Sequence, residues 1–202
     1  MHQLRRLAPA FAASLLLAPI ATAQDADPLC AGLTRIHATA SDELPFIALV
    51  PATQSLGSLP ALKQKPAGME DFTACQLYRA GNAKQGVNGG GPYNYVRCTA
   101  FQKSVDPSDL ATKSAATEAW TKLADRTKAC LTPLGWTVSG GERKRDYEDY
   151  TTEIVFTQPG SLNDIAVTLK EDNSSPGARS SSVYWAVDLY VRNPNPTHPK
   201  PG

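Results

Sequence analysis

The sequence predicts an α+β domain, with one or more antiparallel sheets and two main helices packed on one face. Two segments, near residues 24–40 and 106–132, repeat apolar residues at helical spacing. Several other segments alternate apolar and polar residues, which is typical of strands with one buried and one wet face. The predicted order is helix, strands, helix, strands, and an even number of cysteines indicates that disulfides staple the domain.

The first 23 residues have the layout of a secretory signal peptide. Two arginines give a positive start, residues 7–20 form an apolar stretch, and residues 21–23 read Ala-Thr-Ala, which is an A-x-A cleavage site. The apolar stretch is too short to span a membrane as a helix. We therefore expect cleavage near Ala23, a mature chain that begins at Gln24, and a periplasmic or secreted location.

Basic and acidic residues nearly balance, with 20 Lys and Arg against 19 Asp and Glu. This balance argues against a nucleic-acid binder, which usually carries a basic excess. No later segment approaches the roughly 18 consecutive apolar residues of a membrane-spanning helix, so no membrane span is expected. The length of 202 residues suits one domain, which we expect over residues 24–192.

The first helix is expected to begin at Gln24 or Asp27 and to end at Ala40. Asp27 can cap it, and a proline follows in the first turn. The apolar positions on its single stripe are Leu29, Leu33, Ile36 and Ala40. A short apolar run at residues 46–50, ended by a proline, is expected to form a strand, and residues 51–73 an irregular connection.

The middle of the chain predicts two strands and then the clearest helix. The strands, residues 75–79 and 93–101, flank a glycine-rich loop at residues 81–92. The helix follows an Asp-Pro-Ser-Asp start at residues 106–109, which combines a capping residue, a proline and an acid at the positive helix end. Its apolar side steps through Ala116, Trp120, Leu123, Thr127 and Cys130.

All four cysteines lie beyond the signal peptide, so disulfides in an oxidising compartment are the first interpretation. Four cysteines allow three connectivities. We expect Cys75 to pair with Cys98, which would staple two neighbouring strands, and Cys30 to pair with Cys130, which would tie the first helix to the second. The chain has no C-x-x-C motif and few histidines, so no redox site, metal site or cofactor is expected.

The C-terminal part predicts four strands in succession, at residues 136–139, 150–157, 164–170 and 183–192. In the last strand, one face carries Val183, Trp185, Val187, Leu189 and Val191, and the other carries Tyr184, Asp188, Tyr190 and Arg192. Residues 193–202 are proline-rich and are expected to be a disordered tail. Because a helix followed by strands occurs twice, at residues 25–105 and 106–192, a diverged duplication stays open.

No standard hydrolase or nucleotide-binding motif is present. His37 is expected at the edge of the apolar stripe of the first helix, where a structural role is the simpler interpretation. Adjacent carboxylates could support acid–base chemistry, but we expect each pair in a solvated, loop-like segment. These pairs are Asp42-Glu43, Glu70-Asp71, Glu148-Asp149 and Glu171-Asp172. The sequence therefore names no catalytic residue and favours a non-catalytic protein, with an enzymatic role left open.

The densest polar feature is residues 140–150, where basic residues, acids and tyrosines follow one another. One interpretation is a charged hairpin between two strands. The other is a protein-contact surface, because Tyr and Arg often carry the binding energy of interfaces. Tyrosines beside the glycine-rich loop are further candidates. The residues expected to contact a partner are Arg143, Arg145, Tyr147, Tyr150, Tyr93 and Tyr95.

Two classes of function follow. The first is an exported, non-catalytic binding module that recognises a protein in the cell envelope or outside the cell, by analogy with inhibitor or immunity proteins. The alternative is a small cell-envelope hydrolase that uses carboxylates, or a carrier of a small ligand. This alternative requires a concave pocket in which an acid such as Glu153 or Asp188 converges with aromatic residues.

Overall fold

The computed structural model describes residues 27–42, 44–50, 62, 65–78, 93–146, 149–173 and 182–194. Several sequence predictions fall outside these residues: the signal peptide at 1–23, most of the connection at 51–73, the loop at 81–92, Tyr147 and positions 195–202 of the tail.

The described chain contains two α-helices and six strands, which confirms the predicted α+β class. The helices are α1 (Pro28–Ala40) and α2 (Leu110–Leu131), with short 3-10 helices η2 (Ile47–Leu49) and η4 (Thr132–Leu134). The strands are β1 (Ala74–Tyr78), β2 (Tyr93–Val105), β3 (Thr137–Asp146), β4 (Asp149–Thr157), β5 (Asp164–Asp172) and β6 (Val183–Pro194). No helix among the described residues is long and apolar enough to cross a membrane.

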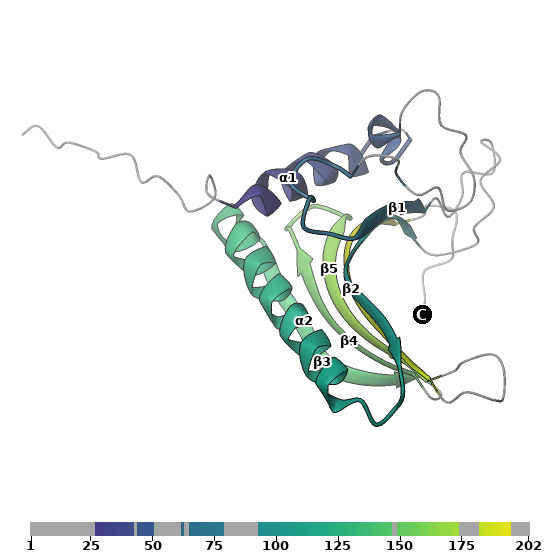
Figure 1. Ribbon diagram of the computed structural model, residues 1–202. Coiled ribbons are helices and arrows are strands. Elements are labelled where there is room, and N and C mark those ends of the chain that lie inside the picture. The colour runs from purple at the N-terminus through teal and green to yellow at the C-terminus, as the bar shows by residue number, and fades with distance from the viewer. Residues whose placement is uncertain are drawn as a thin grey trace, which may run out of the picture.

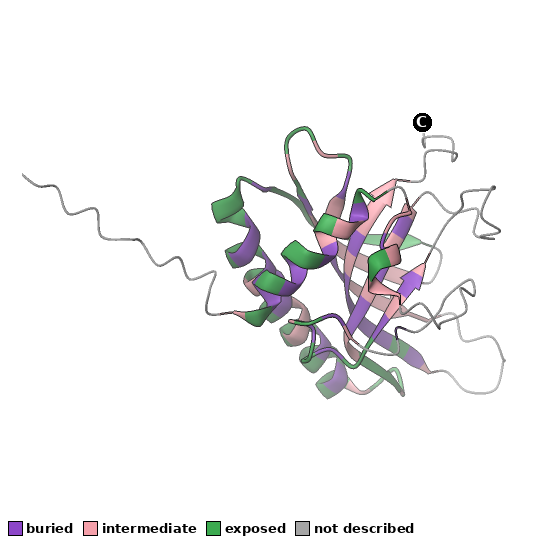
Figure 2. Cartoon of the chain, turned by 90° about the horizontal axis from the view of Figure 1, so that it is seen from above, coloured by how far each residue is buried: buried purple, intermediate pink, exposed green. Residues whose placement is uncertain are grey.

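All six strands form one antiparallel sheet in the order β1-β2-β6-β5-β4-β3. The strands bow toward α2, so the concave face of the sheet is turned away from the helices (Figure 1). Seen from above, the helices are buried where they meet the sheet and exposed on their outer sides (Figure 2). The apolar core therefore lies between the helices and the convex face of the sheet.

Helix α1 begins as its sequence predicts, and both helices pack as predicted. Helix α2 begins later than the predicted start at residues 106–109, at Leu110, and Pro107 lies in a turn before it. The side chain of Asp27 caps α1 by accepting a hydrogen bond from the backbone N–H of Leu29 at 2.9 Å. Asp109 caps α2 in the same way, through the N–H of Thr112 at 3.0 Å. Trp120 of α2 donates its indole N–H to the carbonyl of Val167 in β5 at 3.2 Å, which ties the helix to the sheet. The predicted stripe on α1 is buried, at Leu29, Leu33, Ile36 and Ala40.

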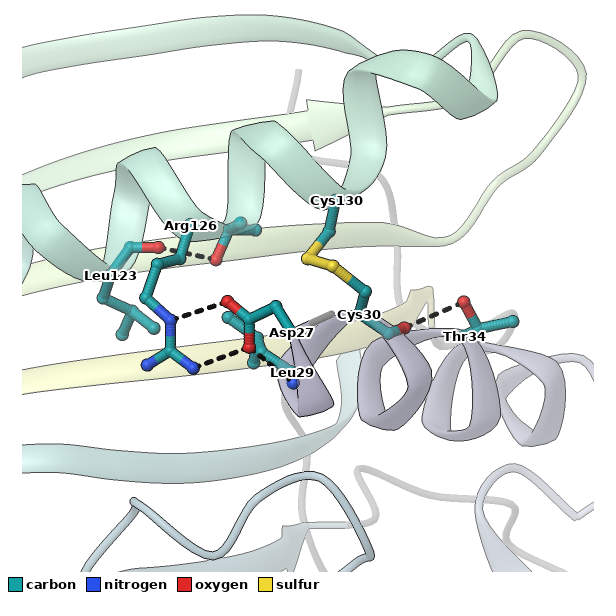
Figure 3. The surroundings of a disulfide bond; sticks show 8 residues. Asp27, Leu29, Cys30, Thr34, Leu123, Arg126 and Cys130 are labelled. Atoms are coloured by element: carbon teal, nitrogen blue, oxygen red, sulfur yellow. Dashed lines mark hydrogen bonds and ion pairs between the residues drawn. A yellow bond between two sulfur atoms is a disulfide. The ribbon is translucent and has the colours of Figure 1, made fainter. Parts of the chain in front are cut away.

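The two disulfides join the pairs that the sequence predicts. Cys75 and Cys98 lie opposite each other on β1 and β2, with their Cα atoms 4.1 Å apart. Cys30 and Cys130, which are 100 positions apart in the sequence, join α1 to α2. Beside this second disulfide, the guanidinium of Arg126 donates two hydrogen bonds to the cap Asp27, at 2.9 and 2.8 Å (Figure 3). One covalent bond and one bidentate ion pair therefore hold the two helices together.

The strand predicted at residues 46–50 is wrong. This run forms the 3-10 helix η2, and its first residue, Phe46, has a left-handed backbone with φ of 64°. The Phe46 side chain is fully buried in the core. A short apolar run is compatible with either a strand or a buried turn. Here the turn forms because it buries the phenyl ring of Phe46.

The charged hairpin predicted over residues 140–150 is confirmed, but its strands are longer than the sequence predicts. β3 continues through Arg143 and Arg145 to Asp146, and β4 begins at Asp149. The register shifts between Gly140 and Arg143, where a bulge is formed by glycines with positive φ. Residues 193 and 194, predicted to belong to the tail, are instead part of β6, which pairs with β2 as far as Pro194.

Removing either disulfide should destabilise the protein. The disulfide that closes the longer loop should cause the larger loss of unfolding free energy. Replacing Cys30 and Cys130 by Ala frees a loop of about 100 residues in the unfolded chain, for which the chain-entropy relation gives about 4.7 kcal/mol. Replacing Cys75 and Cys98 frees a much shorter loop, worth about 3.5 kcal/mol. Urea unfolding of both double variants measures this difference.

The two pairs of variants control for each other, because each truncates two buried cysteines to alanine. A smaller loss of unfolding free energy for the pair that joins the helices would contradict the loop-length explanation.

Candidate functional site

The concave face of the sheet carries a hollow of about 610 Å³. This volume lies within the range of roughly 300–1,000 Å³ that is typical of small-molecule sites. Five strands contribute side chains to it, and only β3 does not. The floor of the hollow holds a small residue, Ala186, between larger polar side chains on both sides.

Strand alternation places these side chains on one face. In β6, alternate residues from Val183 to Val191 enter the core, and the residues between them, together with Arg192, line the hollow. The pairing registers then align Asp188 of β6 with Thr99 of β2 on one side and with Thr168 of β5 on the other. Thr168 is in turn opposite Glu153 of β4. A row of polar side chains therefore crosses four neighbouring strands.

Asp188 is the most deeply buried charged residue of the hollow, with 5% of its surface exposed. Its carboxylate accepts a hydrogen bond from the hydroxyl of Thr99 at 2.5 Å. Burial raises the pKa of Asp188, although Thr99 and the charges of Arg97 and Lys170 act in the opposite direction. Burial also raises the pKa of the neighbouring Tyr190 to about 12, so this phenol remains a hydrogen-bond donor at neutral pH.

The basic residues of the hollow all have acidic partners nearby. Arg192 donates to Glu153 at 2.8 Å and to Asp164 at 2.5 Å. Lys170 forms an ion pair with Asp172 at 3.0 Å. These contacts hold the positive groups in place.

Arg97 completes the charged floor. Its guanidinium donates to the side-chain oxygen of Gln76 on β1 and is hydrogen-bonded to the Tyr190 hydroxyl. Burial lowers the pKa of Arg97, but the carboxylate of Asp188 and the Tyr190 hydroxyl more than offset this effect. Arg97 is therefore a fixed cation that faces the buried acid.

Tyrosines stand at both ends of the hollow. At one end, the rings of Tyr78 and Tyr95 stack with centroids 4.8 Å apart, and Tyr190 meets Tyr95 edge-on at 5.3 Å. Tyr93 lies at the same end, with the Arg192 guanidinium 5.1 Å from its ring centroid. At the other end, Tyr184 is hydrogen-bonded to Gln102 at 3.3 Å.

The structure separates the predicted partner-binding residues into two groups. Tyr93 and Tyr95 line the hollow, whereas Arg143 and Tyr150 line a smaller cavity of about 240 Å³ on the helix side of the sheet. The guanidinium of Arg143 lies 3.6 Å from the centroid of the Tyr150 ring and forms an ion pair with Glu171. Arg145 lies 5.8 Å from the same ring centroid. The predicted residues therefore do not form one surface.

Several residues of the hollow were missed by the sequence reasoning, namely Tyr78, Arg97 and Lys170. The signal was present, because Tyr93, Tyr95 and Arg97 alternate along one strand and must share a face. Asp188 and Glu153, named for the alternative function, do lie in the hollow together with aromatic residues.

The other candidates for catalysis or metal binding lie elsewhere. His37 is half-buried on α1 and packs edge-on against Trp136, with ring centroids 4.8 Å apart. Glu171 and Asp172, expected in a loop, end β5 and form ion pairs with Arg143 and Lys170 respectively. Among the described residues, no three His, Cys, Asp or Glu side chains cluster closely enough to hold a metal ion.

No protein-family model, curated protein or solved structure matches this chain. Its function is therefore inferred from the geometry of its own residues.

Replacing Asp188 by Asn should change how stability depends on pH. Because burial raises its pKa above the ordinary 3.8, the folded protein holds this proton more tightly than the unfolded chain does. The stability contributed by Asp188 is therefore fully present below pH 3.8 and is lost as the pH rises through the raised pKa. We expect Asp188→Asn to become more stable relative to the wild type as the pH rises from about 3 to 7.

Asp27→Asn is the control of opposite sign. The hydrogen bonds from Arg126 lower the pKa of Asp27, so its contribution is present above pH 3.8 and is lost as the pH falls through the lowered pKa. Asp27→Asn should therefore become more stable relative to the wild type as the pH falls. Urea unfolding at each pH measures both trends, and a pH-independent difference for Asp188→Asn would contradict the assignment.

Proposed function

We propose that this protein binds a small polar ligand in the hollow on the concave face of its sheet. The observation that carries the proposal is the convergence of five tyrosines with a buried acid and three basic groups around about 610 Å³ of space. Such a combination of aromatic surface and a few fixed polar groups is typical of ligand sites. We also propose a periplasmic or secreted location, because the two disulfides suit an oxidising compartment.

The contacts of the two acids favour binding over hydrolysis. Carboxylate catalysis needs one acid that gives up a proton and a second that acts as base or nucleophile. Glu153 is instead held by Arg192, at 2.8 Å. Asp188 is hydrogen-bonded to Thr99 and is buried. Both acids are therefore placed to hold polar groups of a ligand.

A thermal-shift panel tests this proposal on the oxidised protein that begins at Gln24. The probes are neutral sugars, amino acids, organic acids, amines and aromatic acids, added one at a time. A ligand at about 100 times its Kd adds about 2.7 kcal/mol of stability, which should raise Tm by roughly 5–10 °C. We expect at least one probe class to produce such a shift.

Two variants assign the shift to a face of the sheet. Tyr95→Ala removes a ring from the hollow and should abolish the shift, whereas Tyr150→Ala makes the same truncation on the helix side and should keep it. A shift that survives Tyr95→Ala but is lost in Tyr150→Ala would place binding in the other cavity and contradict the proposal.

A second candidate function is recognition of a protein by the opposite side, in the manner of an inhibitor or immunity protein. It is favoured by β3, whose ten residues are all exposed at the edge of the described sheet, and by the arginines that flank Tyr150. Tyr and Arg in such positions often dominate interface energies.

Affinity capture from an envelope extract tests this second candidate. The double variant Arg145→Ala/Tyr150→Ala should lose a partner that the wild type retains, because hot-spot truncation weakens binding by about 2 kcal/mol or more. Tyr95→Ala, which alters the hollow instead, is the matched control. A partner retained equally by all three proteins would exclude the β3 side from the interface.

A further inference from the structure

The charged groups of the hollow are paired with one another before a ligand enters. Arg192 is shared between Glu153 and Asp164, and Lys170 is paired with Asp172. A ligand of either sign would have to compete with these existing pairs. A neutral ligand can hydrogen-bond to the same groups without separating them, so this pairing favours an uncharged ligand.

The hydrogen-bonding groups of the floor are of both kinds. Arg97, Lys170 and the Tyr190 hydroxyl are donors, whereas the carboxylates of Asp188 and Glu153 accept. A hydroxyl group donates one hydrogen bond and accepts others, so a molecule with several hydroxyls satisfies both kinds at once. An apolar ligand would instead cover the charged groups of the floor without hydrogen-bonding to them, which is costly.

The tyrosines indicate the shape of the ligand. Tyr184 and Tyr190 are six positions apart on β6, and at about 3.4 Å per residue they lie roughly 20 Å from each other along the strand. The stacked pair Tyr78 and Tyr95 extends the aromatic surface at the Tyr190 end. Tyrosine rings cover the apolar face of a flat molecule while their hydroxyls stay polar. Rings at both ends of the floor suit an elongated ligand with more than one ring.

From these three observations we infer that the ligand is a neutral oligosaccharide. Its apolar ring faces pack on Tyr95 and Tyr184, and its hydroxyls hydrogen-bond to Asp188 and Arg97 between them. This inference rests on the proposed function, because it names the ligand class for the same hollow.

Three trisaccharides of equal length differ in charge. The neutral probe is the trimer of N-acetylglucosamine, the cationic probe is the trimer of glucosamine, and the anionic probe is the trimer of galacturonic acid. A printed array of neutral and charged glycans widens the choice of sugar. We expect a neutral oligosaccharide to bind, and its charged counterparts to bind at least tenfold more weakly in calorimetric titration.

Variants then assign the contacts. Asp188→Asn should weaken binding of the neutral oligosaccharide at least tenfold, and an intact melting transition shows that the variant is folded. Tyr184→Ala should weaken binding of an oligosaccharide at least tenfold. Binding of a monosaccharide of the same sugar should weaken much less, because the Tyr184 ring lies at one end of the site. Tyr150→Ala, on the opposite side of the sheet, should change neither affinity.

The outcomes distinguish this inference from the proposed function. If no neutral glycan binds while another probe class gives a shift that depends on Tyr95, the ligand class is wrong and the binding function stands. If a charged glycan binds more tightly than its neutral counterpart, the charge-pairing inference is overturned. If no probe of any class binds in the hollow, both proposals fail.

Discussion

The pairing of β6 on both of its edges is the constraint from which the rest of the structure follows. β2 and β5 hold this strand over most of its length, so none of its side chains can change face without breaking two ladders. One set of alternate residues therefore builds the core against the helices, and the other set forms the floor of the hollow. The core and the hollow therefore lie on opposite faces of the same strand.

The helices cover only the core face of the sheet. The helices α1 and α2 are joined to each other by the Cys30–Cys130 disulfide and by the bidentate ion pair between Arg126 and Asp27. The concave face has no such cover among the described elements, so its polar groups stabilise one another in rows across the strands. This arrangement explains how a carboxylate as buried as Asp188 is accommodated beside water-accessible tyrosines.

Local patterns in the sequence were sufficient for much of the fold, and they failed where a long-range contact decides. The alternation in residues 183–192, the cap at Asp27 and the pairing of Cys75 with Cys98 follow from near neighbours or from simple spacing, and the two remaining cysteines are then left to pair with each other. The turn at Phe46 depends on a core formed by distant elements, and the bulge at Gly140 depends on which residues of β4 lie opposite. Likewise, the separation of Arg143 from Tyr95 is visible only when the strand order is known.

The exposed edge of β3 has a consequence for how copies of this molecule behave toward one another. A long strand with a free edge invites a second chain to add to the sheet. Here that edge is interrupted by the bulge at Gly140–Arg143 and carries three consecutive basic residues, Arg143 to Arg145. Two such edges brought together would oppose like charges along a bent backbone, which disfavours the pairing of two copies through this edge.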